Sequence, residues 1–248
     1  MSSPVVLIPG APVLVPELSG AAAVESTREV EMLCEQLRRA SVSASRVVVV
    51  GTDPQRRTLQ DVSSSLRRWG ADVRVGRPSA PSAPQGSVPD AALIAWWMLD
   101  RAGSGLPRTF EAVDEQGRIA NSTPVKVSGG DALVVVVADG PASLTPRAPV
   151  PEDPRGVALD AALTAWLRDG GALPDPGPAA SAEVGWWSRP SWLALAGLVG
   201  DRTAVDTVSW APFGVGYHAA RWEPIPPRAT SVAGSSTTGC AAYDGGPR

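Results

Sequence analysis

Histidine is nearly absent from this 248-residue sequence, which contains only His218. Imidazole is the commonest metal ligand in proteins and the group used most often for acid–base catalysis. A single histidine excludes a histidine-rich metal centre. Any acid–base chemistry would therefore depend on carboxylates or on one lone imidazole.

Cysteine is scarce as well, with two residues in the whole chain. Cys34 lies in a predicted helix and Cys240 in a polar segment near the C-terminus, so a disulfide would have to join a core element to a chain end. We expect two free thiols, with Cys34 packed in the core.

Concentrated positive charge and long apolar runs are also missing. The net charge is −3 and the arginines are scattered, so no segment offers the basic field that attracts nucleic acid. The densest apolar patch, at 93–99, is much shorter than the roughly 18 residues that a membrane helix needs. The N-terminal segment lacks a basic start and is interrupted by prolines, unlike a signal peptide. We expect a soluble, cytoplasmic protein with neither a nucleic-acid nor a membrane partner.

Aliphatic runs and periodic apolar residues predict an α/β fold. Strands are expected at 5–8, 46–50, 72–75, 133–137, 204–210 and 215–222, and helices at 25–39, 59–69, 90–102, 157–167 and in a stretch carrying Trp186, Trp187 and Trp192. The opening βαβαβ order is typical of a parallel sheet. We predict one domain at 1–225, with a central mostly parallel or mixed sheet flanked by helices. A flexible tail rich in Pro, Ser, Thr and Gly is predicted at 226–248.

Three segments near predicted strand ends carry a specific pattern. They read IPGAPVLVPEL at 8–18, ADGPASLTPRAPVPEDPRGVALDAAL at 138–163 and WAPFGVGYHAARW at 210–222. In order and spacing they resemble the catalytic (B) subunit of class III extradiol ring-cleavage dioxygenases, the protocatechuate 4,5-dioxygenase type, over residues 4 to about 224. The middle segment agrees best, and PFGVGY at 212–217 is a second match. The agreeing positions of the middle segment are Asp139, Leu144, Thr145, Pro146, Ala148, Pro149, Asp153, Pro154, Gly156 and Asp160.

The resemblance implies an Fe(II) centre held by two histidines and a carboxylate, with a further histidine as the acid–base group. Carried over residue by residue, the two ligand histidines fall on Gly10 and at or next to Asp53. The carboxylate ligand falls on Trp210, and the acid–base histidine falls on Ala142. None of the three histidines is retained, and the carboxylate ligand is replaced by a tryptophan. We therefore expect a metal-free relative without a cofactor, although the family uses Fe(II).

Other residues could form a displaced site in the same cleft, and the candidates are Asp53, Asp139, Tyr217 and His218. Asp53 and Asp139 follow strands, where open α/β sheets bind ligands, and together with Glu17 they could hold Mg²⁺ or Mn²⁺. The plainer interpretation is that Asp139 orders its loop and Asp53 starts a turn. His218 is either a lone base near the pocket or a hydrogen-bonded packing residue.

Tryptophan is unusually frequent, with nine residues against two Phe and two Tyr. Such residues could line an aromatic ligand pocket, but large apolar side chains usually fill contacts between helices and sheets. We interpret most of the nine as core residues. Trp210 is the exception, because an indole at the former ligand position would fill the cleft and shrink or close its pocket.

Three functions follow from these residues. The first is a metal-free binding or scaffold protein, which could engage a small aromatic ligand, a protein partner or a second copy of the chain. The second is an enzyme with a displaced site in the same cleft. The third is a residual aromatic ring-opening dioxygenase, which one histidine makes difficult because iron would need mostly carboxylate ligands.

Overall fold

The computed structural model describes residues 3–119 and 131–223, apart from the side chains of 21–23. Within these ranges a seven-stranded sheet has the order β3-β6-β2-β7-β1-β9-β8. Its strands are β1 (Val5–Ile8), β2 (Arg46–Thr52), β3 (Thr58–Leu59), β6 (Arg108–Val113), β7 (Ala132–Val137), β8 (Asp206–Trp210) and β9 (Tyr217–Trp222). The predicted tail and Cys240 lie outside the described residues.

The centre of the sheet is parallel and its two edges are antiparallel. β6, β2, β7 and β1 run parallel to one another, whereas β9 is antiparallel to β1. At the edges, β8 runs antiparallel to β9, and β3 runs antiparallel to β6. The predicted α/β class with a mostly parallel or mixed central sheet is therefore confirmed.

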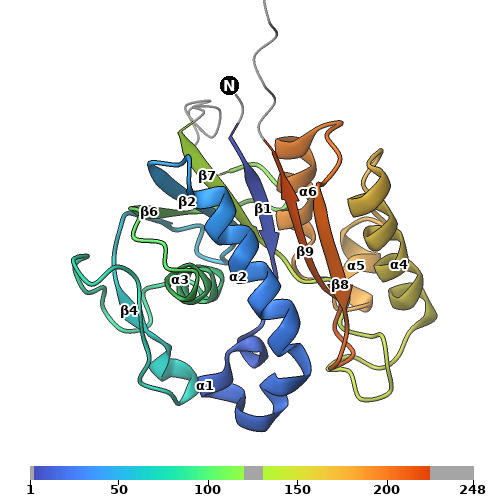
Figure 1. Ribbon diagram of the computed structural model, residues 1–248. Coiled ribbons are helices and arrows are strands. Elements are labelled where there is room, and N and C mark those ends of the chain that lie inside the picture. Colours follow the sequence, from blue (N-terminus) through green and yellow to red (C-terminus); the bar gives the residue numbers. More distant parts are fainter. Residues whose placement is uncertain (1–2, 120–130, 224–248) are drawn as a thin grey trace, which may run out of the picture.

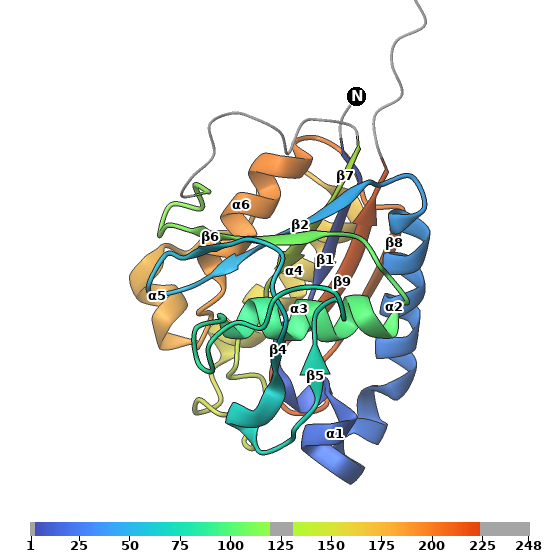
Figure 2. The ribbon, with the colours of Figure 1, turned by 90° about the vertical axis from the view of Figure 1, so that its left-hand side faces the viewer.

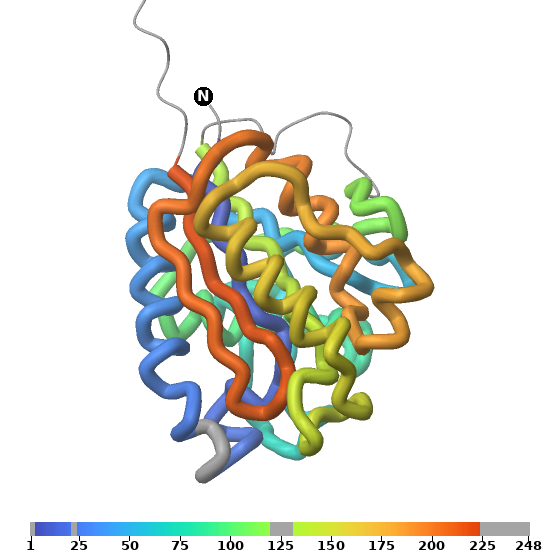
Figure 3. Tube along the Cα trace, turned by 90° about the vertical axis from the view of Figure 1, so that its right-hand side faces the viewer, coloured from blue at the N-terminus to red at the C-terminus, as the bar shows by residue number. Residues whose placement is uncertain are grey.

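Helices cover both faces of this sheet (Figure 1). α2 (Thr27–Ser41) and α3 (Asp90–Arg101) lie on one face, and α4 (Pro154–Asp169), α5 (Pro178–Glu183) and α6 (Arg189–Val199) lie on the other. Figure 2 shows α3 in front of the central strands with α2 at the right-hand side, and Figure 3 shows α4 beside the β8–β9 pair. The chain is a three-layer α/β/α structure.

Side-chain alternation along the central strands builds a separate core on each face. In β1, Val6 and Ile8 pack into the core under α2 and α3, whereas Val5 and Leu7 pack into the core under α4 and α6. β2 and β7 alternate in the same way, so nearly every position in these strands is buried. Strands covered on both faces favour the continuous aliphatic runs seen in the sequence.

The most regular predicted elements are confirmed. Strands form at 5–8, 46–52 and 132–137, helices form at 27–41, 90–101 and 154–169, and the final strand pair forms at 206–210 and 217–222. Cys34 is a free, buried thiol, as predicted. Burial raises its pKa to about 11, despite the opposing effect of nearby arginines.

The predicted helix at 59–69 is wrong. That stretch forms β3, the short strand β4 (Ser64–Ser65) and a 3-10 turn, Leu66–Trp69. Three consecutive serines lie in its middle, and Ser63 bonds outside the stretch, donating from its N–H to Pro81 O and from its hydroxyl to Ala80 O. Serine competes with helix formation through such alternative hydrogen bonds.

The predicted third strand of the sheet is also misplaced. Arg74 and Val75 form β5, which pairs antiparallel with β4 in a separate two-stranded sheet. The next strand of the main sheet is β6, which the sequence did not suggest because it begins with a charged residue, Arg108. The Arg108 side chain is nevertheless buried, because its guanidinium donates to Trp96 O, Ser104 O and Asp100.

Two of the tryptophans assigned to a helix lie outside one. Trp186 and Trp187 are in the turn between α5 and α6, and Trp192 alone lies in α6. Within 3–119 and 131–223, no helix has the length and apolarity required to cross a membrane.

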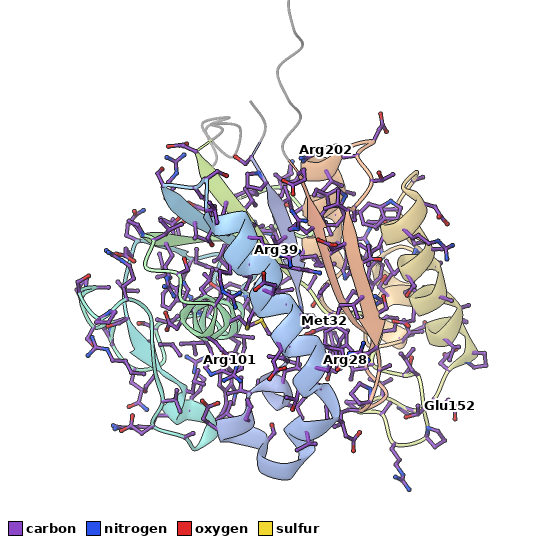
Figure 4. The ribbon with its side chains drawn as sticks, in the orientation of Figure 1. Arg28, Met32, Arg39, Arg101, Glu152 and Arg202 are labelled. Atoms are coloured by element: carbon purple, nitrogen blue, oxygen red, sulfur yellow. The ribbon has the colours of Figure 1, made fainter. Side chains whose placement is uncertain are left out.

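The two faces of α2 give a test of the packing. Leu33 is 0% exposed in the core, and Met32 beside it is 41% exposed on the outer face with Arg28 and Arg39 (Figure 4). Leu33→Ala should lower the free energy of unfolding by about 2–5 kcal/mol, because it leaves a cavity. Met32→Ala should change it by less than about 0.5 kcal/mol. Urea unfolding of both variants checks this, and equal losses would contradict the assignment of the two faces.

Candidate functional site

A cleft lies at the edge of the sheet where the parallel strands end. β2 and β7 are neighbours, but the chain leaves β2 toward α3 and β6, and leaves β7 toward α4, α6 and the opposite edge. Connections that diverge in this way open a crevice at the carboxyl ends of the strands, where α/β proteins bind ligands. This crevice contains a cavity of about 370 Å³.

The cavity is lined by residues from the strand ends and from the starts of two helices. They are Gly10, Thr52, Asp53, Pro54, Arg57, Arg68, Pro89, Asp90, Ala91, Val137, Asp139, Trp187 and Ser188. The structure thus brings together Asp53 and Asp139, two of the four predicted site residues, and adds Arg57, Arg68 and Trp187, which sequence analysis missed. The four-residue spacing of Asp53 and Arg57 was an available signal for their pairing. No local pattern marked Trp187.

Asp53 is held as a carboxylate by Arg57. Its Oδ1 accepts from Arg57 Nη2 at 2.7 Å, and its Oδ2 accepts from Arg57 Nε at 2.8 Å and from the Arg57 backbone N–H at 2.9 Å. Burial opposes ionisation, but these hydrogen bonds and the guanidinium charge outweigh it and lower the pKa of Asp53. The Asp53 carbonyl also accepts from Arg56 N–H, which confirms the predicted turn.

Asp139 is in a different environment. Its Oδ1 accepts a hydrogen bond of 2.9 Å from Gly10 N–H, which ties the loop after β7 to the loop after β1. Among the described residues, no arginine forms an ion pair with it. Burial raises the pKa of Asp139 to about 6, although the Gly10 N–H and the nearby His218 favour the charged form. The loop-ordering role is therefore confirmed, and the same carboxyl can exchange a proton near neutral pH.

Tyr217 and His218 do not line this cavity. They alternate along β9, so Tyr217 packs into the α2–α3 core and His218 packs on the opposite face against Trp192, with ring centroids 5.3 Å apart. Burial, and then the Asp139 charge, raises the pKa of Tyr217. Both His218 ring nitrogens are hydrogen bonded, Nε2 with Asp160 Oδ1 at 3.0 Å and Nδ1 with Ser209 Oγ at 2.9 Å. These contacts agree with a hydrogen-bonded packing residue.

The prediction that Trp210 closes the cleft is wrong. Its indole packs against Tyr217, with ring centroids 5.6 Å apart, and donates from Nε1 to Ser26 Oγ at 3.1 Å. This places the ring on the α2 side of the sheet, away from the cavity lining. The tryptophan at the cavity is Trp187, whose side chain is 63% exposed.

The donor set does not fit an iron centre. Gly10 has no side-chain donor, and a Cβ at this position would lie 2.8 Å from Val137 Cγ1, so a larger residue requires the Val137 side chain to move. Both Asp53 oxygens are engaged by Arg57, and Trp210 offers only an N–H donor, which Ser26 accepts. Ala142, onto which the resemblance would place the acid–base histidine, is buried and has no group that titrates.

The alternative carboxylate site for Mg²⁺ or Mn²⁺ is not formed either. Glu17 lies exposed on α1 (Pro16–Ser19) and does not line the cavity with Asp53 and Asp139. In the part of the chain that the structure describes, no three His, Cys, Asp or Glu side chains are grouped so that they could hold a metal ion.

Comparison with known proteins adds no relative: no protein-family model matches the chain, and no curated protein matches it. The structural class is α/β, with a polar cleft at the carboxyl ends of its parallel strands.

The pKa of Asp139 leads to a prediction about stability. The folded state holds the proton more tightly than the unfolded state, so stability should fall as pH rises from about 4 to about 6. The full pKa difference corresponds to roughly 3 kcal/mol of unfolding free energy. Asp139 is partly exposed to solvent, which screens its interactions, so we expect a loss of about 2 kcal/mol. Asp139→Asn keeps an acceptor for Gly10 N–H and removes the charge.

Urea unfolding of wild type and Asp139→Asn between pH 4 and 7 measures this effect. All other titrating groups are shared, so the difference between the two proteins isolates Asp139. The variant should gain stability relative to wild type as pH rises from about 4 to about 6. A stability difference that does not change with pH would show that the pKa of Asp139 is the same in the folded and unfolded states.

Proposed function

We propose that the chain is a metal-free relative of class III extradiol dioxygenases that binds a small hydroxylated aromatic compound in the cleft. The proposal is supported by the way the three motif segments meet. Gly10 N–H donates to Asp139, Gly216 N–H donates to Pro141 O, and Leu144 N–H donates to Gly214 O. The segments that carry the resemblance are thus hydrogen bonded to one another around one end of the sheet.

The observation that carries the binding proposal is the environment of Asp139. Its carboxyl lies at the cavity with Gly10 N–H as a hydrogen-bond donor and without an ion-pair partner among the described residues. A ligand hydroxyl can donate to this group, and a hydrogen bond to a charged acceptor is among the stronger ones available. Asp53 does not compete for that role, because Arg57 already occupies both of its oxygens.

The size and walls of the cavity favour a single aromatic ring. Its volume of about 370 Å³ is at the small end of ligand pockets. The Trp187 indole supplies a flat apolar wall, and Val137 and Ala91 add aliphatic surface. A hydroxylated ring therefore finds an apolar wall for its face and a carboxylate for its hydroxyl. In this proposal the hydroxyl binds protein directly, where the dioxygenases would use iron.

One observation favours a second candidate, an enzyme that moves a proton at Asp139. A carboxyl with a pKa of about 6 is populated in both protonation states near neutral pH, as a general acid or base requires. Asp53 would stay ionised beside it, because Arg57 lowers its pKa. This enzyme would use Asp139 without Tyr217 and His218, which lie outside the cavity lining. Residual ring opening is the weakest alternative, since the donor set does not fit iron.

Calorimetric titration with catechol and with 3,4-dihydroxybenzoate tests the binding function. Wild type should bind at least one of them equally well with and without EDTA, and more tightly as pH rises through about 6, where Asp139 ionises. Asp139→Asn should weaken binding about tenfold, the effect of losing one charged hydrogen bond. Asp72→Asn is the matched control, because Asp72 is exposed outside the cleft and should leave binding unchanged.

The outcomes separate the candidates. Equal affinity in folded Asp139→Asn and wild type would contradict the assigned binding role. Iron-dependent oxygen uptake with catechol would overturn the metal-free proposal. Metal-independent turnover of a bound compound, lost in Asp139→Asn, would favour the enzyme.

A further inference from the structure

Trp187 forms a wall of two cavities at once. It lines the cleft that contains Asp139, and it also lines a second cavity of about 470 Å³ between α5, α6 and the turn that follows β6. A tryptophan side chain that is 63% exposed leaves a large apolar surface in contact with water. Because Trp187 lines both cavities, its exposed indole can contact a ligand in either of them.

Hydrogen bonds and close packing fix the elements that surround the second cavity. Arg189 makes two hydrogen bonds of 2.6 Å to Asp175 and a third, of 3.3 Å, to Glu115 O, so it ties the start of α6 to two loops. The turn after β6 packs directly on α6 at Gly117, where a Cβ would lie 2.6 Å from Leu193 Cβ. These contacts fix the walls around Trp187.

The chemistry of the second cavity differs from that of the cleft. Its surface is mostly apolar, with Pro178, Ala182, Trp186 and Leu193 among the residues that line it. The charge of Arg189 is already compensated by Asp175. The other charged residue on the lining, Glu115, is an exposed carboxylate that would repel an anionic ligand. The largely apolar walls therefore suit an uncharged apolar group.

We propose that the two cavities form one ligand site in two parts, with the Trp187 indole as their shared wall. The cleft receives the hydroxylated ring, and the second cavity receives an uncharged alkyl or aryl substituent of the same ligand. This inference rests on the proposed function, because the position of the ring is set by Asp139. Trp187 is then the residue that determines specificity for substituted over unsubstituted rings.

Calorimetry with catechol and 4-butylcatechol tests the proposal. In wild type, 4-butylcatechol should bind at least tenfold more tightly than catechol, since each buried methylene contributes about fourfold. Trp187→Ala should reduce this ratio to less than about threefold. Ala182→Glu should also reduce it while leaving catechol affinity unchanged, because Ala182 lines only the second cavity. Ala179→Glu, an exposed position on the same helix outside both linings, is the matched control and should keep the full ratio.

The result also distinguishes the two proposals. If catechol binds through Asp139 and the butyl group adds no affinity in wild type, the two-part site is overturned and the proposed function stands. If neither compound binds, both the proposed function and the two-part site are overturned. If 4-butylcatechol binds through Trp187 and Ala182 but Asp139→Asn has no effect, the two cavities are not one site and the inference is overturned.

Discussion

The burial of β1, β2 and β7 on both faces is the constraint on which the rest of the molecule depends. Helices cover each face, so consecutive side chains enter one core or the other and almost none can be polar. A charged group within these strands would be buried without a partner, at a large cost in free energy. Polar chemistry is therefore confined to the strand ends, where Gly10, Asp53 and Asp139 lie.

The divergence of the chain at that edge gives two carboxylates opposite environments. After β2 the chain turns back within four residues, and Arg57 neutralises Asp53. After β7 the chain runs toward the other face, and Asp139 meets a backbone N–H in place of a guanidinium. One carboxyl is thereby held ionised and structural. Burial raises the pKa of the other to about 6, and it has no ion-pair partner among the described residues. Carboxyl pairs separated in this way can take different roles at one site.

Much of the fold could be predicted because its central elements obey a simple period. Aliphatic runs marked β1, β2 and β7, and apolar stripes marked α2, α3 and α4. The stretch at 59–75 could not be predicted, because Ser63 donates hydrogen bonds to Ala80 O and Pro81 O in a later loop, and no local period records those partners. β6 was missed for a related reason, since the partners that allow Arg108 to be buried lie in and after α3.

The candidate site was predictable to a similar degree. Position after a strand was enough to select Asp53 and Asp139, because parallel strands bring their carboxyl ends to one edge. Tyr217 and His218 were selected from a neighbouring motif, yet alternation along β9 sends them into the two cores. Trp187 could not be selected, because its exposure depends on how the α5–α6 turn meets the cleft. The aromatic residue expected there was Trp210, which packs beside Tyr217 instead.

Packing and hydrogen bonding, as well as residue identity, make positions 10 and 53 unsuited to hold a metal ion. At position 10 a Cβ would lie 2.8 Å from Val137 Cγ1, so the Val137 side chain would have to move, and Gly10 N–H holds Asp139. At position 53, a metal ligand would first have to displace Arg57, which also donates to Ser87 O and so anchors the segment before α3. The cleft at this end of the sheet is thus organised by two contacts, the hydrogen bond from Gly10 N–H to Asp139 and the pairing of Arg57 with Asp53.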